Sequence, residues 1–134
     1  AMIEVFADAS FFVALFNERD ELHQFAVAWV RKYTGKTTTT CWVLTEFANY
    51  FAGHPKRLSV GAYLADLQAD SQFAVLPADE LQYKNGLQLY RSRPDKKWSL
   101  TDCISFAVME QRCLTTALTA DHHFEQAGFQ ILLK

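Results

Sequence analysis

Short runs rich in β-branched and aromatic residues alternate along this chain with longer segments in which apolar residues recur at helical spacing. We interpret the short runs as strands, at residues 3–7, 36–40, 72–77, 115–119 and 129–133. The longer segments are predicted to be helices, at residues 10–17, 20–33, 41–51, 57–70, 78–92, 99–111 and 122–128. Strands that alternate with helices indicate a sheet sandwiched between helices. The pattern therefore predicts an α/β fold, a three-layer α/β/α sandwich around a central, mostly parallel sheet.

Size and composition indicate one globular domain. The 134 residues, half of them apolar, can bury a core, and no repeat or linker interrupts them. We expect a single domain over residues 2–134, with Ala1 a remnant of cloning. No apolar run approaches the ~20 residues that span a bilayer, and the first residues lack the pattern of a signal peptide. We therefore expect a cytoplasmic protein without membrane contact, with small buried cysteines at Cys41, Cys103 and Cys113.

Charge is unevenly distributed, although the net charge of −2 excludes a basic surface over the whole molecule. We define the basic window as residues 84–98, which contain five cations and one acid and include Tyr90 and Trp98. Such a segment can hold phosphates on its cations while the aromatic rings stack on bases. Its candidate nucleic-acid contacts are Arg91, Arg93, Lys96 and Lys97. A solvated helix end and loop explains the same charges equally well.

Four acids follow strands of the predicted sheet or lie in the helices beside them. Asp8 directly follows the first strand, and Asp121 follows the fourth. Glu46 lies in the helix after the threonine strand, and Asp102 lies in the first turn of its helix. In a parallel sheet these elements open on one edge, so carboxylates gathered there would raise one another's pKa. Mg²⁺ or Mn²⁺ binds such oxygen ligands and would relieve the repulsion, as in sites that cleave phosphodiesters.

Each of these acids also has a purely structural interpretation. Ser99 and Asp102 have the spacing of a capping box, with Asp in place of the usual Glu or Gln. Asp8 and Asp121 can be N-cap residues after strands, and Glu46 can be a solvated residue of its helix. Spacing alone leaves the structural interpretation and the metal-ligand interpretation open.

Four segments resemble, in order, the signature segments of PIN-domain proteins, in particular the VapC-type toxins of bacterial and archaeal toxin–antitoxin pairs. They are VFADASFFVALFN from Val5, VLTEFANYF from Val43, WSLTDCISFAVMEQ from Trp98 and ALTADHHFEQAGFQIL from Ala117. The resemblance extends over nearly the whole chain, and the last two segments are its most specific part. It implies a metal-dependent nuclease that cleaves RNA and is built around a central parallel sheet.

The resemblance also implies roles for individual residues. The catalytic acids of the family fall on Asp8, Glu46, Asp102 and Asp121. Asp8, Asp102 and Asp121 would bind Mg²⁺, directly or through water, and Glu46 would complete or orient the shell. Ser10 and Thr119 match hydroxyl residues next to the metal site, and Asp95 lies where some members carry a further acid.

From the resemblance we expect a Mg²⁺-dependent endoribonuclease, with Mn²⁺ as a possible substitute, in which an ion-activated water attacks the RNA phosphodiester. The expected partners are the RNA substrate, a cognate antitoxin and a second copy of the chain in a homodimer. The alternatives are a nuclease of RNA processing or defence without an antitoxin, and a non-catalytic RNA-binding or scaffold protein. A zinc site at His122 and His123 is not expected, because adjacent residues on a helix point apart and no Cys or His partners stand at known spacings.

Overall fold

A computed structural model describes residues 3–133, so Ala1, interpreted above as a cloning remnant, lies outside the described residues. Five strands form one sheet in the order β3-β2-β1-β4-β5, and all four neighbouring pairs are parallel. The strands are β1 (Val5–Ala7), β2 (Thr37–Thr40), β3 (Phe73–Leu76), β4 (Thr116–Leu118) and β5 (Gln130–Ile131). The predicted α/β sandwich with a parallel sheet is therefore confirmed.

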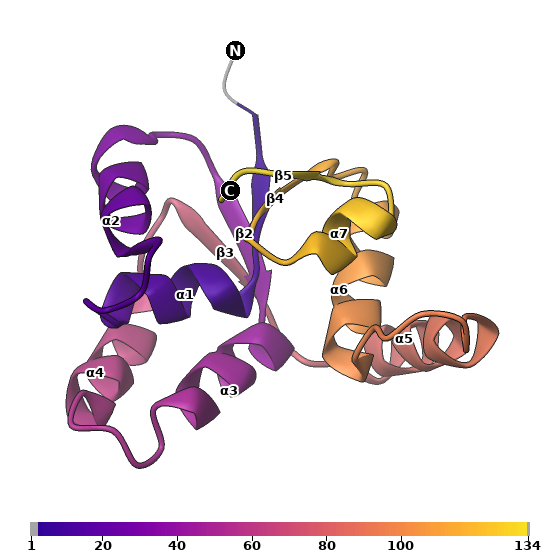
Figure 1. Ribbon diagram of the computed structural model, residues 1–134, viewed down its shortest axis with the longest axis horizontal. Helices are drawn as coiled ribbons and strands as arrows, with labels where there is room; N and C mark the ends of the chain where they lie inside the picture. The colour runs from indigo at the N-terminus through magenta and orange to yellow at the C-terminus, as the bar shows by residue number, and fades with distance from the viewer. Residues whose placement is uncertain (1–2, 134) are drawn as a thin grey trace.

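Helices cover both faces of this sheet (Figure 1). They are α1 (Ala9–Phe16), α2 (His23–Lys32), α3 (Cys41–Tyr50), α4 (Arg57–Leu67), α5 (Glu80–Ser92), α6 (Leu100–Gln111) and α7 (His122–Gln126). In Figure 1, α1, α2 and α4 lie to the left of the sheet and α5, α6 and α7 to its right. Helix α3 follows β2 without a loop and contacts both α1 and α6. It therefore bridges the two helical layers where β2 ends.

Hydrogen bonds from side chains set where several elements begin. All four threonines of β2 are buried, and Thr39 donates its hydroxyl to the carbonyl of Ala7 in β1 over 2.9 Å. Thr40 ends the strand and caps α3, because its Oγ1 accepts the N–H of Val43 over 3.1 Å. A capping box between Asp79 and Gln82 begins α5. Polar residues with short side chains thus mark the change from extended to helical backbone.

The core consists of two aromatic clusters, one on each side of the sheet. On the side of α1, rings of α1, α3 and α4 pack together, among them Phe12, Phe47 and Tyr63. On the side of α6, Phe106 packs edge to face with Trp98 and Phe124, at ring-centroid distances of 5.1 and 4.8 Å. Because both faces of the sheet are covered, β1 and β4 are buried along their whole lengths.

The predicted elements are present, with boundaries that differ by a few residues. Strand β5 has two residues where five were predicted, and α2 begins three residues later than expected. One prediction about the cysteines is wrong: Cys103 is buried, but Cys41 is half-buried and Cys113 is exposed in the turn after α6, with a φ of 58°. Among residues 3–133, no helix is both long enough and apolar enough to cross a membrane.

Candidate metal centre

Asp8 lies buried where β1 ends, next to the end of β4. Its backbone N–H donates to the carbonyl of Leu118, the last residue of β4, over 3.3 Å. The residue is 4% exposed. Although Asp8 occupies the N-cap position of α1, its side chain makes no N-cap hydrogen bond. The cap interpretation is therefore wrong for the Asp8 carboxylate. It accepts a hydrogen bond from Thr119, which directly follows β4.

Two hydroxyl groups link Asp8 to the loop after β4. Thr119 donates its hydroxyl to Asp8 Oδ2 over 2.9 Å and accepts the backbone N–H of Asp121 over 3.0 Å. Ser10 Oγ lies 2.8 Å from Thr119 Oγ1 and accepts the N–H of Ala120 over 3.3 Å. Ser10 and Thr119, expected near the site, thus hold the ends of β1 and β4 together and orient one oxygen of Asp8.

Asp102 is both a capping residue and a member of the acidic group. Its backbone N–H donates to Ser99 Oγ over 3.0 Å, and its Oδ2 accepts the Ser99 N–H over 3.3 Å. These bonds form the capping box at the start of α6, so the capping interpretation is correct. The same Oδ2 lies 3.3 Å from Nδ1 of His123 on α7. Asp102 is 7% exposed, which places a buried carboxylate at the beginning of the helix.

Asp121 caps α7, and this cap brings a histidine to the acids. Asp121 Oδ1 accepts the backbone N–H of His123 over 2.9 Å and lies 3.4 Å from the Nδ1 of its ring. The rings of His122 and His123 are 4.5 Å apart between centroids, so the expectation that they point apart is wrong. Sequence reasoning missed His123, because ideal helix geometry does not describe the first turn of a five-residue helix.

Glu46 reaches the same region from the surface of α3. Thr101, in the first turn of α6, hydrogen-bonds to its carboxylate. Loss of water around the carboxyl group raises the pKa of Glu46, and the charges of Asp102 and Asp121 raise it further. Glu46 is exposed on its helix, as the structural interpretation expects, and its carboxylate also lies close enough to Asp102 and Asp121 to be affected by their charges. We call Asp8, Glu46, Asp102 and Asp121 the acidic cluster.

Members of the acidic cluster oppose one another's ionisation. Burial raises the pKa of Asp8 to about 7, and the charges of Asp102 and Glu46 add to this rise. The pKa of Asp102 is also raised, first by burial and then by Asp121, while Ser99 and His123 lower it. Each of the four carboxylates therefore lies close enough to another to affect its ionisation or to be affected by it, at the same edge of the sheet.

The chemistry of these side chains fits a divalent cation. Carboxylate oxygens are ligands for Mg²⁺ and Mn²⁺, and a double positive charge would offset the repulsion that raises the pKa values of Asp8, Glu46 and Asp102. Donor atoms of Asp121, His122 and His123 lie within 4.8 Å of one another, so imidazole nitrogens are available beside the oxygens. The donor set therefore fits a divalent cation at this edge of the sheet, with three of the donor atoms gathered at the start of α7.

The basic window lies next to this site, at the end of α5 and in the loop before α6. Together with Ser99, Leu100 and Cys103 it lines a groove of about 800 Å³ that extends to the start of α6. Arg93 forms a bidentate ion pair with Asp95, over 2.9 and 2.8 Å, which lowers the pKa of Asp95 to about 2. Asp95 is therefore paired with a cation of its own loop.

One expectation for the basic window is wrong. Trp98 is 6% exposed, packs against Phe106 and donates its Nε1–H to Gln126 over 3.0 Å. It is a core residue and cannot stack on a base, whereas Tyr90 is 49% exposed. Arg93 and Lys96 lie above the Trp98 ring, at 5.3 and 5.9 Å from its centroid. The face of the Trp98 ring thus makes cation–π contacts with Arg93 and Lys96.

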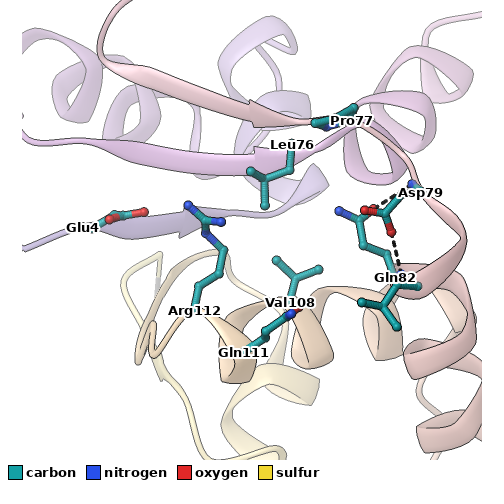
Figure 2. A pocket seen from close by; sticks show the side chains of 9 residues that line it. Glu4, Leu76, Pro77, Asp79, Gln82, Val108, Gln111 and Arg112 are labelled. Carbon is teal, nitrogen blue, oxygen red and sulfur yellow. Dashed lines mark hydrogen bonds between the residues drawn. The ribbon is translucent and has the colours of Figure 1, made fainter.

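A second cavity, of about 580 Å³, lies between the sheet and helices α5 and α6 (Figure 2). Glu4 and Arg112 lie toward one end of it, and the capping pair Asp79 and Gln82 lies at the other. Gln82 also accepts the Nε1–H of Trp42 over 2.8 Å. No member of the acidic cluster lines this cavity. The chemistry expected from the sequence therefore belongs to the carboxyl edge of the sheet.

Among the solved structures with the same fold are three from different bacteria. VapC20 from Mycobacterium tuberculosis, described as a sarcin–ricin loop cleaving toxin, superposes with a TM-score of 0.84 at 23% identity, over 93% of this chain and 95% of that one. FitAcB from Neisseria gonorrhoeae superposes with a TM-score of 0.66 at 18% sequence identity, over 96% of each chain. VapBC2 from Rickettsia felis was solved bound to a DNA fragment from its own promoter. It superposes with a TM-score of 0.67 at 10% sequence identity, over 97% of this chain and 98% of that one.

No curated protein sequence matches this chain significantly. The profile of the PIN domain matches residues 5–130, which begin with β1 and end in β5. This span contains the whole acidic cluster, the basic window and both aromatic clusters of the core. With the parallel sheet and the gathered carboxylates described above, the match leads to one conclusion: the chain belongs to the PIN domain family.

Proposed function

We propose that this protein is an endoribonuclease that depends on Mg²⁺ or Mn²⁺ and serves as the toxin of a toxin–antitoxin pair. The observation that carries the proposal is the acidic cluster, in which carboxylates from four separate elements lie at the carboxyl edge of a parallel sheet, close enough for their charges to raise the pKa values of Asp8, Glu46 and Asp102. Membership of the PIN domain family supports nuclease chemistry. The description of VapC20 as a toxin that cleaves the sarcin–ricin loop supports RNA as the substrate.

The proposed division of labour follows the burial of each side chain. Asp8, Asp102 and Asp121 hold the cation, and Glu46 orients the shell from the more exposed side. When bound, the cation supplies Lewis-acid chemistry: it makes water a better nucleophile and offsets charge on the phosphate and the leaving oxygen. Thr119 keeps Asp8 Oδ2 aimed into the site by its 2.9 Å hydrogen bond.

RNA approaches this site along the groove of the basic window in our proposal. The exposed cations Arg91 and Lys97 hold phosphates on either side of the cleaved bond, and Lys96 and Arg93 contribute from above Trp98. Tyr90 is the exposed aromatic residue of the window available to stack on a base. The groove also includes Ser99, which caps the helix that carries Asp102, so bound phosphates would lie near the acidic cluster.

Incubation with a mixed RNA pool tests the proposal. Cleavage should appear with Mg²⁺ or Mn²⁺, disappear with EDTA and give a limited set of mapped ends. Asp8→Asn, purified in the same way, should not cleave and so controls for contaminating ribonucleases. Cleavage that persisted in EDTA, or an equal rate with Asp8→Asn, would count against the proposed site.

The antitoxin and the homodimer are proposed on the resemblance to VapC-type toxins, and the fold shared with VapBC2 supports a paired system. A short reading frame next to the gene should encode the antitoxin, and its product should co-purify with this chain and suppress RNA cleavage. Light scattering of the purified chain should give twice the mass of 15.3 kDa. A neighbouring product that neither binds nor inhibits would favour a nuclease without an antitoxin.

A further inference from the structure

His123 joins two members of the acidic cluster that come from different elements. Its Nδ1 lies 3.3 Å from Asp102 Oδ2 on α6 and 3.4 Å from Asp121 Oδ1 at the start of α7. The ring is mostly enclosed, with 21% of the side chain exposed, and the side chain of Asp102 is 10% exposed. By contrast, 71% of the His122 side chain is exposed, and its Nδ1 lies 3.8 Å from one carboxylate, that of Asp121.

The distance from His123 Nδ1 to each of the two carboxylate oxygens suits a pair of ligands on one cation. Two ligands that bind one ion at about 2.1 Å lie about 3.0 Å apart at an octahedral angle and about 3.4 Å apart at a tetrahedral angle. The distances from His123 Nδ1 to the two carboxylate oxygens fall in this range. The N-cap bond from the His123 backbone to Asp121 Oδ1 fixes the position of the ring relative to that carboxylate.

We propose that His123 is a nitrogen ligand of the metal centre and that it biases the site toward Mn²⁺ over Mg²⁺. The inference rests on the proposed function, because it assumes that the acidic cluster binds a cation. Both ions bind carboxylate oxygens, but Mg²⁺ demands a near-ideal octahedral shell of oxygen ligands, whereas Mn²⁺, a first-row transition ion, accepts an imidazole nitrogen more readily than Mg²⁺ does. A mixed set of carboxylates and one imidazole therefore distinguishes this centre from one made of carboxylates alone. His123 binds through Nδ1, and its Nε2 stays outside the set of ligands.

The alternative is that the His123 ring is only a counter-charge for Asp102 and Asp121. In that case a cation would have to displace it, and removing the ring would leave metal affinity unchanged or increase it. The two roles thus predict opposite effects of the same substitution. His54→Ala is the control, since it removes an imidazole from the loop between α3 and α4, outside the group of donor atoms formed by Asp121, His122 and His123.

Calorimetric titration of the full chain with Mn²⁺ and with Mg²⁺ separates the two roles. His123→Ala should weaken Mn²⁺ binding about tenfold or more and change Mg²⁺ binding far less. His54→Ala should bind both ions like the parent protein. Equal losses for both ions, or tighter Mn²⁺ binding by His123→Ala, would overturn the inference.

Electron spin-echo spectroscopy of the Mn²⁺-loaded protein tests the bond itself. A nitrogen coupling to Mn²⁺ should be present in the parent protein and in His54→Ala, and absent in His123→Ala. A coupling that remained in His123→Ala would overturn the inference while leaving the proposed nuclease intact. If neither ion bound the parent protein, the proposed metal centre would fail together with the inference.

Discussion

Asp102 accepts the Ser99 N–H through the same oxygen that lies beside His123, so one side chain serves both the helix and the acidic cluster. The sequence left open whether Asp102 is a helix cap or a member of a metal site, and the structure shows that a capping residue can also belong to the acidic cluster. A cap fixes the carboxylate at the first turn of α6, and this fixed position lets it act on Asp8 and Glu46. The hydrogen bonds that cap α6 therefore also hold the Asp102 carboxylate in its place within the acidic cluster.

The raised pKa of Asp8 predicts that the metal-free protein loses stability as pH rises. Asp8 has a pKa of about 7 in the folded protein and 3.8 in the unfolded chain, so between these pH values the folded protein binds more protons. The stability that Asp8 contributes by binding this proton is therefore fully present below pH 3.8 and is lost as the pH rises through about 7. At about 1.4 kcal/mol per pKa unit, the loss between pH 5 and pH 8 is about 3 kcal/mol. Denaturant unfolding in EDTA should show this loss.

Asp8→Asn isolates the effect, because an amide cannot ionise and keeps a similar shape. The variant should match the parent protein near pH 4 and exceed its unfolding free energy at pH 8. Parallel pH profiles for the two proteins would contradict the assignment of this titration to Asp8.

The pattern of residues predicted the acidic cluster but not its histidine. Asp8 and Asp121 could be placed together because both follow strands of a parallel sheet, whose ends share an edge. The approach of His123 depends on the irregular first turn that Asp121 caps, and periodicity carries no information about such a turn. The burial of Trp98 was missed for a related reason, since its hydrogen-bond partner Gln126 is 28 residues away in the sequence.

At the level of elements, helices α5 and α6 pack so closely that a glycine is required between them. A Cβ added at Gly86 would lie 2.8 Å from the Cα and 2.9 Å from the backbone N of Ile104. Backbone atoms cannot move aside as a side chain does, so Gly86→Ala should destabilise the protein by about 1–3 kcal/mol despite the better helix propensity of alanine. Chemical denaturation measures the change.

Gly61 provides the control for this prediction. It lies within α4, and a Cβ there would have no neighbour within 4 Å. Gly61→Ala should therefore raise the unfolding free energy by up to about 1 kcal/mol through helix propensity alone. If both substitutions changed stability in the same direction, close packing of α5 on α6 would not explain the glycine at position 86.

Binding by the basic window should depend steeply on salt. Each phosphate contact to a single strand contributes about 0.7 to the slope of log affinity against log salt concentration. Replacement of all four candidate cations by alanine should lower the slope by about 2–3, with Arg93 contributing least because Asp95 already pairs with it. The substitutions are Arg91→Ala, Arg93→Ala, Lys96→Ala and Lys97→Ala.

Arg31 and Lys32 form a matched pair of cations on α2, across the sheet from α5 in Figure 1. A double alanine variant at these positions should keep the parent slope for RNA binding. If this pair changed the slope as much as the basic window did, RNA binding would be a property of general surface charge.

Over the whole molecule, the alternation of strands and helices predicted the layers, but not the order of the strands. The chain places β3 at one edge, then crosses by way of α5 and α6 to add β4 on the far side of β1. This crossover brings α6, and therefore Asp102, over the end of β1 where Asp8 lies. Strand order depends on how whole helices pack, which the local pattern of apolar residues does not encode.

The central claim is that the acidic cluster is a metal site, and the melting of Asp102→Asn with and without metal tests it most directly. The parent protein should gain about 2.7 kcal/mol of stability at a cation concentration one hundred times its Kd. In EDTA, Asp102→Asn should be as stable as the parent protein or more stable, because one of several repelling charges is gone. Its gain from Mg²⁺ or Mn²⁺ should be lost. A variant that gained the same stability from either ion as the parent protein would show that Asp102 serves only as a cap, and would contradict the account.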